Sequence, residues 1–354
     1  MGIKMDDVES KGEGKKMRRV AVFGGAGFIG AHLGRYLKDR GYWVRVVDKK
    51  YHRYMRNDAY CDDFTLGDLR NANVAKSAIR GVTEVYNLAA DMGGIGFIKT
   101  KFARVMYNNI TINKNVIKAC IEGEVDKLFF SSSACVYPQY VQDKTGIVPQ
   151  LKESEVLPAE PDSYYGYEKL FTELMLNAFR RDYPDFNFRI ARFHNIQGIY
   201  TNWYNIRAKA PAALCRKVAM LPKEGGEIEV WGDGKQVRTF LNIKDCCEAV
   251  YRLMRLRDSK YYSLVSEDSM IPPALNIGST EEITIDDLVD MIAEIAEKKV
   301  IKRHDISKPQ GVRSRSANIS LALNLLNWKP KYSLKQTMEE VYKFVSKRVK
   351  VEVL

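Results

Sequence analysis

The sequence has no apolar run near the roughly 18 residues that a membrane span needs. Residues 1–16 are polar and mixed in charge, without the hydrophobic stretch of a secretion signal, and we expect them to form a disordered lead. The six cysteines are scattered, with no C-x-x-C pair and no histidine at ligand spacing, so neither a disulfide framework nor a metal site is indicated. These absences argue against a membrane or secreted protein, and the cytoplasm is the expected compartment.

The net charge is +12, from 56 basic and 44 acidic residues. A basic surface can attract anionic ligands, from nucleic acid to a sugar diphosphate, but charge is also what a solvated surface needs. No aromatic RNA-binding signature and no basic recognition helix accompany the charge. The charge alone therefore names no partner, and we expect neither a nucleic acid nor a membrane to be one.

The first half of the chain alternates short apolar runs with helical patterns, which is typical of βαβ units and a parallel sheet. The strand candidates are residues 19–23, 43–47, 64–66, 85–89, 128–131 and 188–191. Between them, residues 109–121 and 165–179 have helical spacing. The pattern predicts an α/β fold with a Rossmann-type, doubly wound parallel sheet.

The second half is less regular. Asp233-Gly234 is a typical hairpin turn, and it predicts that residues 227–231 pair with residues 236–240. Thr284 is a typical N-cap for a helix over residues 285–298. We expect residues 17–195 to form the sheet domain, with return segments near 236–255 and 273–280. Residues 196–354 should form mainly a smaller α/β lobe that binds substrate.

A glycine motif lies between the first strand and the first helix, at Gly24, Gly27 and Gly30. Such glycines let the backbone turn sharply and approach a pyrophosphate at the helix N-terminus, where free N–H groups favour anions. Asp48 ends the next strand, where a carboxylate binds the adenosine ribose and repels a 2′-phosphate. The motif in this context predicts an NAD site in residues 17–195.

Further candidates for cofactor contact follow neighbouring strands. Phe28 and Ile29 open the helix after the glycines. Asp68, followed by Leu69, comes after the third strand, where a carboxylate can meet the adenine amino group. Ala89 follows the fourth strand, where a small side chain lets the backbone lie close to the cofactor.

Tyr165 and Lys169 share one face of a predicted helix because they are four residues apart. A tyrosine phenol has a reference pKa of about 10, and a neighbouring lysine together with a positive nicotinamide favours the phenolate that a base requires. Ser133 ends a strand and can hydrogen-bond the same substrate hydroxyl. Together the three side chains predict hydride chemistry at a hydroxyl group.

These motifs, with Trp231-Gly232-Asp233-Gly234, resemble the extended short-chain dehydrogenase/reductase family over almost the whole chain, from about residue 18 to residue 344. The resemblance implies a sugar nucleotide whose hydroxyl is oxidised by NAD and then reduced again within one turnover. A transient 4-ketone makes the hydrogens on C3 and C5 acidic, and chemistry there needs a second acid/base pair. Cys135, two residues after Ser133, is a candidate base because a thiolate forms readily beside a cation.

Several segments resemble the GDP-mannose 3,5-epimerase branch of that family in particular. They are residues 89–94, 132–138, 158–161, 192–195, 209–217 and 311–315. The resemblance implies that Cys135 and Lys209 are the acid/base pair at C3 and C5, giving GDP-L-galactose or GDP-L-gulose. It places these residues at the GDP-hexose: Gly93, Asn195, Lys217, Gln236, Arg238 and Arg315. It also implies a homodimer formed through the helices at 109–121 and 165–179.

The chain departs from that branch on the sugar side. Ala208 stands where the branch has an acidic residue, and residues 197–199 and 204–206 also differ. Two alternatives therefore stay open within the family, a nucleotide-sugar 4-epimerase and a 4,6-dehydratase. A third, of another class, is a non-enzymatic NAD- or RNA-binding module that has kept the fold.

Overall fold

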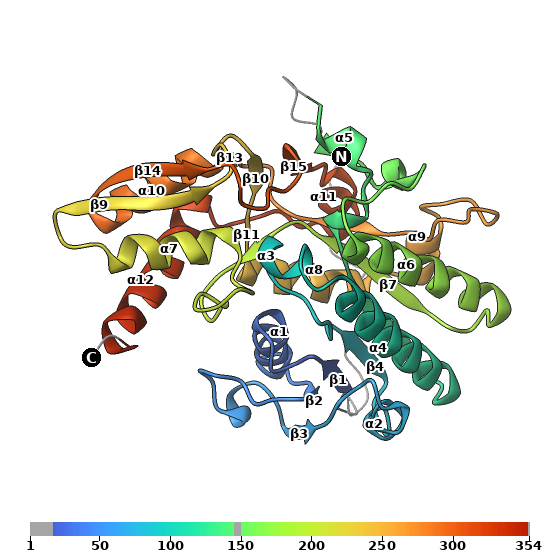
Figure 1. The fold of residues 1–354 in the computed structure, drawn as a ribbon. Helices are drawn as coiled ribbons and strands as arrows, with labels where there is room; N and C mark the ends of the chain where they lie inside the picture. Colours follow the sequence, from blue (N-terminus) through green and yellow to red (C-terminus); the bar gives the residue numbers. More distant parts are fainter. Residues whose placement is uncertain (1–16, 145–149, 353–354) are drawn as a thin grey trace, which may run out of the picture.

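The computed structural model describes residues 17–144 and 150–352, so the predicted disordered lead at 1–16 lies outside the described residues. Its largest element is a parallel sheet (Figure 1) in the order β12-β7-β5-β4-β1-β2-β3. Its strands are β1 (Arg19–Phe23), β2 (Trp43–Asp48), β3 (Asp63–Leu66), β4 (Glu84–Asn87), β5 (Lys127–Ser133), β7 (Phe188–Phe193) and β12 (Leu275–Ile277). The order reverses between β1 and β4, which is the doubly wound, Rossmann-type arrangement. The predicted fold class is confirmed.

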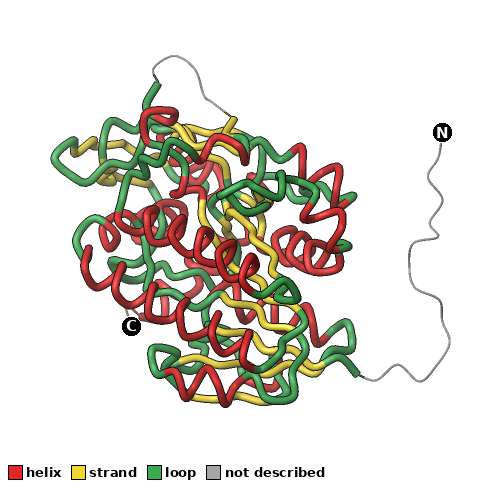
Figure 2. The backbone as a smooth tube through the Cα atoms, turned by 90° about the vertical axis from the view of Figure 1, so that its right-hand side faces the viewer, coloured by secondary structure: helices red, strands yellow, loops and turns green. Residues whose placement is uncertain are grey.

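Helices cover both faces of this sheet (Figure 2). α1 (Phe28–Lys38) packs against α8 (Ile243–Arg255), whereas α4 (Phe102–Glu122) packs against α2 (Ala72–Ala78) and α6 (Tyr164–Asp182). Parallel strands covered in this way are apolar on both sides. The sheet therefore needs the nearly continuous apolar runs that the sequence shows.

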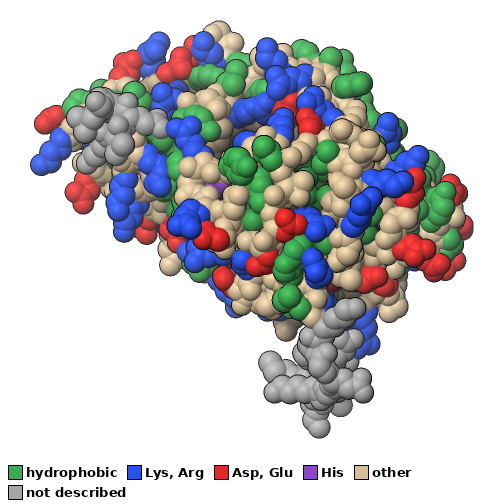
Figure 3. Space-filling model, turned by 90° about the horizontal axis from the view of Figure 1, so that it is seen from below, with side chains coloured by type: hydrophobic (Ala, Val, Ile, Leu, Met, Phe, Trp, Pro, Cys, Tyr) green, Lys and Arg blue, Asp and Glu red, His purple; other side chains and the backbone are tan. Residues whose placement is uncertain are grey.

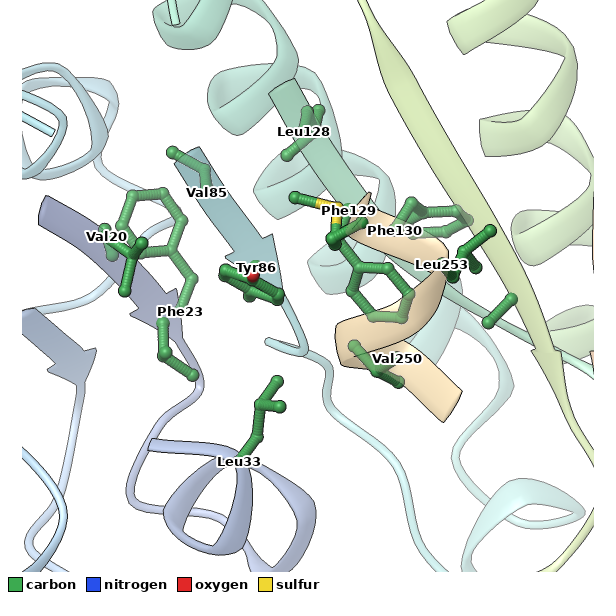
Figure 4. Close-up of a cluster of buried hydrophobic side chains, with 14 of the residues drawn as sticks. Val20, Phe23, Leu33, Val85, Tyr86, Leu128, Phe129, Phe130, Val250 and Leu253 are labelled. Atoms are coloured by element: carbon green, nitrogen blue, oxygen red, sulfur yellow. The ribbon is translucent and has the colours of Figure 1, made fainter. Parts of the chain in front are cut away.

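The main core lies between the sheet and these helices. Val20, Phe23 and Phe129 are fully buried, and Val250 and Leu253 of α8 complete the cluster (Figure 4). A helix later in the chain, α11 (Ser320–Leu326), packs on β12 and α8. This return to the sheet has no signal in the sequence. The sheet domain thus draws on segments from both halves of the chain.

A second lobe has its own core around α7 (Ala210–Met220), α10 (Ile285–Ala296) and α12 (Leu334–Glu352). Its four-stranded sheet has the order β13-β10-β15-β6, and two-stranded sheets pair β14 with β9 and β11 with β8. These strands are β6 (Gln150–Leu151), β8 (Ile196–Gln197), β9 (Gly225–Trp231), β10 (Val237–Thr239), β11 (Leu241–Asn242), β13 (Glu282–Thr284), β14 (Lys299–Asp305) and β15 (Ser314–Ala317).

The short helices of the whole described part of the chain are α3 (Ile95–Ile98), α5 (Gln139–Gln142), α9 (Asp258–Tyr262), η1 (Asn57–Ala59), η2 (Ala134–Val136) and η3 (Glu153–Val156).

The predicted hairpin at Asp233-Gly234 is wrong. β9 pairs in parallel with β14, and β10 pairs with β13 and β15, so the two strands belong to different sheets. Gly232 and Gly234 have φ values of +81° and +72°, which strongly favour glycine. The glycines therefore turn the chain sharply, as predicted, but they direct it from one sheet into another.

Charge on the surface is mixed. Lysine and arginine side chains alternate with aspartate and glutamate over the face seen in Figure 3. The excess of positive charge is therefore spread out on this face rather than gathered in one patch. Within residues 17–144 and 150–352, no helix is both long enough and apolar enough to cross a bilayer.

A buried ion pair fastens α6 to the sheet. Arg192 on β7 and Glu173 on α6 are both fully buried, with Nη2 to Oε2 2.7 Å and Nε to Oε1 3.1 Å. Ser132 also donates to Glu173, at 2.5 Å, and Arg192 donates to the carbonyl of Glu153, at 2.8 Å. Because charge-assisted, bidentate bonds have strict geometry, they determine where α6 lies on the ends of β5 and β7.

Glu173→Gln should lower the free energy of unfolding by about 3 kcal/mol, because it leaves the buried guanidinium without its charge partner. Denaturant unfolding followed by circular dichroism measures this. The matched control is Glu122→Gln, which breaks exposed pairs with Lys76 and Lys118 and should cost less than about 1 kcal/mol. Equal losses in the two variants would show that the buried pair does not fasten the helix.

Candidate active site

The glycine turn is built for close backbone approach. Gly24 has φ +74°, and a Cβ there would lie 2.8 Å from the Cα of Ala89. A Cβ on Gly30 would lie 2.4 Å from the carbonyl oxygen of Gly24. Gly27 is the N-cap of α1, which begins with Phe28 and Ile29, and no side chain caps the first N–H groups of this helix. This geometry fits a dinucleotide pyrophosphate.

Two carboxylates lie near this turn. Asp48 accepts a hydrogen bond from the Ala26 N–H at 3.1 Å, and burial raises the pKa of Asp48 while Lys50 opposes the shift. Asp68 is held by Arg70, with Nη2 to Oδ2 2.5 Å, and this contact lowers the pKa of Asp68. The Leu69 side chain is buried in the core, so only its backbone remains for a ligand. Asp48 thus lies at the glycine turn, whereas Asp68 has an arginine partner.

The hydride candidates meet where α6 passes the end of β5. Lys169 is almost fully buried and donates to the carbonyl of Ser131 at 3.0 Å, and its Nζ lies 5.7 Å from the centre of the Tyr165 ring. The Ser133 hydroxyl accepts from the Cys135 N–H at 3.2 Å and lines the same pocket as the Tyr165 phenol, whose rise in pKa it opposes. A Cβ on Gly166 would lie 2.1 Å from the carbonyl oxygen of Cys135. Glycine at 166 therefore lets α6 lie directly against η2.

Burial shifts the ionisable groups at this point toward their neutral forms. It raises the pKa of Tyr165 well above its ordinary value, and Cys135 and Glu168 add to the effect. It lowers the pKa of Lys169, which Glu168 opposes, and it raises the pKa of Glu168 to about 7. The Tyr165 phenol consequently needs an additional positive charge nearby before it can act as a base.

Cys135 lies in η2, half-buried, beside an arginine. Arg315 Nη1 donates to the sulfur at 3.0 Å, and Arg315 Nε donates to Gln142 at 2.6 Å. Arg315 Nη2 lies 3.6 Å from a carboxylate oxygen of Asp162. Lys209, the N-cap residue of α7, lines the same pocket. Burial lowers the pKa of Lys209, and the proximity of Cys135 opposes the shift.

One pocket of about 400 Å³ holds these side chains between the sheet and the second lobe. The predicted catalytic and substrate residues that line it are Gly93, Ser133, Cys135, Tyr165, Asn195, Lys209, Lys217, Gln236, Arg238 and Arg315. Lys169 lies behind Tyr165, outside the lining. The structure therefore brings together side chains that span more than two hundred positions of the sequence.

Other polar side chains of the pocket are hydrogen-bonded within the protein. Lys217 donates to the carbonyl of Glu229 at 2.6 Å, and Gln236 donates to Gln310 at 2.8 Å. Arg238 donates to the carbonyls of Val237 and Val312, both at 2.7 Å. Burial, with Arg315 close by, lowers the pKa of Arg238 to about 9. Desolvated cations of this kind favour an anionic ligand.

Two other lining residues had no signal in the sequence. Lys99 donates to the carbonyl of Asp162 at 2.5 Å, and both residues face the pocket. Ile206 and Ala208, which the sequence marks as departures from the related branch, also line the pocket. No spacing rule links residues 99, 162 and 206, because only the folded chain brings them together. Among the described residues, no cluster of potential metal ligands occurs.

Comparison with known proteins gives matches over most of the chain. The model of the NAD dependent epimerase/dehydratase family matches residues 20–264. GDP-mannose 3,5-epimerase of Arabidopsis thaliana is 38% identical over 334 residues, which cover 94% of this chain and 84% of the relative. GDP-mannose 3,5-epimerase 1 of Oryza sativa subsp. japonica is 36% identical over 94% of this chain and 83% of the relative. GDP-L-fucose synthase of Escherichia coli K12 is 27% identical over 92% of this chain and 96% of the relative.

Solved structures share the fold. UDP-glucose 4-epimerase of Thermotoga maritima, determined with UDP-glucose, superposes with a TM-score of 0.79 at 24% identity, over 94% of this chain and 99% of that one. UDP-glucose 4-epimerase of Thermus thermophilus, in complex with NAD, gives 0.76 at 22% identity, over 92% and 98%. With the family model and the relatives above, these matches lead to one conclusion: the chain belongs to the NAD dependent epimerase/dehydratase family.

Proposed function

We propose that this protein is an NAD-dependent nucleotide-sugar epimerase that acts on GDP-mannose and inverts C3, C5 or both. The observation that carries the proposal is that a thiol (Cys135) and an amine (Lys209) share one pocket with Tyr165. The relatives named GDP-mannose 3,5-epimerase support the choice of substrate. The products would be GDP-L-galactose, GDP-L-gulose or a mixture.

The first task of the site is to handle the C4 hydroxyl of the hexose. The chemistry that NAD supplies when bound is the reversible removal of a hydride from C4, which leaves a transient 4-keto sugar. Tyr165 accepts the hydroxyl proton, and Ser133 holds the oxygen through a hydrogen bond. Lys169, one helical turn from Tyr165, supplies positive charge that favours the phenolate against the effect of burial.

The second task is to exchange protons at C5 and C3. The ketone makes these hydrogens acidic because the carbanion is stabilised as an enolate. The Cys135 thiolate, beside the Arg315 guanidinium, takes the proton from one face of the ring. The Lys209 ammonium then donates a proton to the other face, and the carbon is inverted. Tyr165 then gives its proton back to the C4 oxygen, which restores the hydroxyl group when the hydride transfer is reversed.

The remaining polar residues suit the nucleotide diphosphate. Arg238 and Arg315 supply buried positive charge for phosphate oxygens, and Lys217 adds a third cation. Gln236 and Asn195 supply amide groups, and Gly93 leaves room for the sugar. We assign these six residues to substrate binding.

The thiol also bears on the alternatives. A 4-epimerase needs no acid/base pair beyond the hydride site, so it would leave Cys135 and Lys209 without a task. A 4,6-dehydratase typically uses an acidic residue in the stretch where Cys135 stands.

Because the proposed base must stay reduced, and all six cysteines are free thiols, the proposal also places the enzyme in the cytoplasm.

With GDP-mannose in deuterated water, the purified protein with NAD should give product whose C5, C3 or both carry deuterium and inverted configuration. Proton NMR of the sugar ring reports both changes. The control substrate is UDP-glucose, which should not react. Inversion confined to C4, or loss of water from C5 and C6, would replace the proposal with one of the two alternatives.

Cys135→Ala should lower the rate of deuterium uptake at C5 and C3 by about 100-fold or more, because the base that removes those protons is gone. NAD should remain bound, which is measured by denaturing the protein and quantifying the released cofactor. Cys247→Ala, which changes a core cysteine of α8 instead, should keep exchange near the wild-type rate. Undiminished exchange in Cys135→Ala would remove the thiol from the mechanism.

We further propose a homodimer through the outward faces of α4 and α6. Apolar rings gather there at high exposure: Tyr107 is 72% exposed, Tyr164 53% and Phe171 49%. Phe102 and Tyr164 are in ring contact, so the two helices form one continuous surface. A second copy of the chain is the partner that this family resemblance suggests.

Light scattering should therefore give twice the chain mass of 40.5 kDa. Phe171→Glu should shift the protein to the monomer, because a charge buried in an apolar interface has no partner. Met270→Glu changes an exposed apolar residue outside both helices and should leave the dimer intact. A monomeric wild-type protein at micromolar concentration would contradict this assignment.

A further inference from the structure

A carboxylate outside the assigned machinery lies at the centre of a bonded cluster. Asp91 is 3% exposed and follows β4. Its Oδ2 accepts from Arg104 Nε at 2.8 Å and Asn108 Nδ2 at 2.9 Å, and its Oδ1 accepts from Arg207 Nη2 at 2.7 Å. These donors lower the pKa of Asp91 to about 2, against the effect of burial. Asp91 is thus charged and held rigidly under working conditions.

Arg207, which binds the Asp91 carboxylate, lies on the loop before α7 and makes further contacts there. Its Nη1 donates to the carbonyl of Met92 at 2.7 Å, and its guanidinium lies 3.8 Å above the Phe97 ring. Its own carbonyl accepts from the Gly94 N–H at 3.0 Å. Arg207 is therefore fixed by its side chain and by its backbone. Lys209 comes two residues later.

The two glycines after Asp91 make this contact possible. A Cβ on Gly93 would lie 3.0 Å from the Cα of Arg207, and a Cβ on Gly94 would lie 2.2 Å from the carbonyl oxygen of Ala208. No larger residue fits at Gly94 without moving the loop. The loop that carries Lys209 is consequently pressed onto the segment that carries Asp91.

The same cluster reaches the helix of the hydride site. The Asp91 N–H donates to Asn109 Oδ1 at 2.6 Å, and Asn109 Nδ2 donates to Glu168 Oε1 at 2.8 Å. Glu168 lies beside Lys169 on α6, with 4.0 Å from its Oε1 to the Lys169 Nζ. Hydrogen bonds therefore connect the loop of Lys209 to the helix of Tyr165 and Lys169.

We propose that Asp91 is a positioning residue that holds Lys209 against the sugar through Arg207. It touches neither substrate nor cofactor in this role. The inference rests on the proposed function of Lys209 as the proton donor that completes inversion. Because proton transfer is sensitive to displacements near 1 Å, loosening this loop should cost about 100-fold in the step that uses Lys209.

The chain offers a matched pair of variants. Arg207→Met and Arg104→Met each remove one guanidinium group that donates to the Asp91 carboxylate. Of these two arginines, only Arg207 lies on the loop that carries Lys209. We expect Arg207→Met, in deuterated water with GDP-mannose, to keep exchange through Cys135 while inversion falls about 100-fold. Arg104→Met should keep the wild-type ratio of inversion to exchange, and Lys209→Met should match Arg207→Met. A wild-type ratio in Arg207→Met would overturn the proposal.

A second readout needs no substrate. Reductive ¹³C-methylation gives each lysine an NMR signal, and the signal absent from Lys209→Arg belongs to Lys209. In the wild type, and in Arg104→Met, its pKa should lie below the ordinary lysine value, because burial lowers it. In Arg207→Met the pKa should move back toward the ordinary value of about 10.4. An unchanged Lys209 pKa in Arg207→Met would overturn the positioning role. If the Lys209 pKa shifts in Arg207→Met as expected but the wild-type protein exchanges no deuterium, only the proposed function is overturned.

Discussion

The close seating of α6 on the end of β5 is the constraint from which the site follows. The buried Arg192–Glu173 pair fixes the helix on the sheet, and Gly166 lets it touch the backbone of Cys135. Tyr165 then meets Ser133, and Lys169 reaches the carbonyl of Ser131. A helix displaced by even a small side chain at 166 would separate the phenol from the serine and the thiol from the pocket.

The pocket is rich in desolvated cations. Burial lowers the pKa values of Lys169, Lys209 and Arg238. The pocket lining also includes the carboxylates of Asp162, 3.6 Å from Arg315, and Glu229, 3.5 Å from Lys217. Charges held in this way are costly unless opposite charge arrives. In the proposed function, a nucleotide diphosphate would supply that charge, and a positive nicotinamide ring would supply the charge that the Tyr165 phenol lacks. Substrate and cofactor therefore complete the electrostatics of the site.

The sequence predicts a local feature correctly where the residues that require it lie close together in the chain. Gly30 is required because a Cβ there would meet the carbonyl of Gly24 in the same turn, Gly24 has a positive φ of +74°, and Thr284 caps α10 through its own helix. The turn at Asp233-Gly234 was also real, but its partner strands were misassigned. Pairing of β9 with β14 and of β10 with β15 depends on segments about 70 to 80 residues away, which no local pattern specifies.

The sequence by itself determined the parallel α/β sheet, the dinucleotide turn and the Tyr165/Lys169 pair, because strand burial, helix-start geometry and i,i+4 spacing act over a few residues. A family resemblance pointed to Cys135 and Lys209. The tertiary structure alone decided that Arg315 faces the thiol, that Asp68 is taken by Arg70, and that Asp91 holds the loop of Lys209. Such contacts join residues remote in the chain, and their geometry exists only once both lobes have packed.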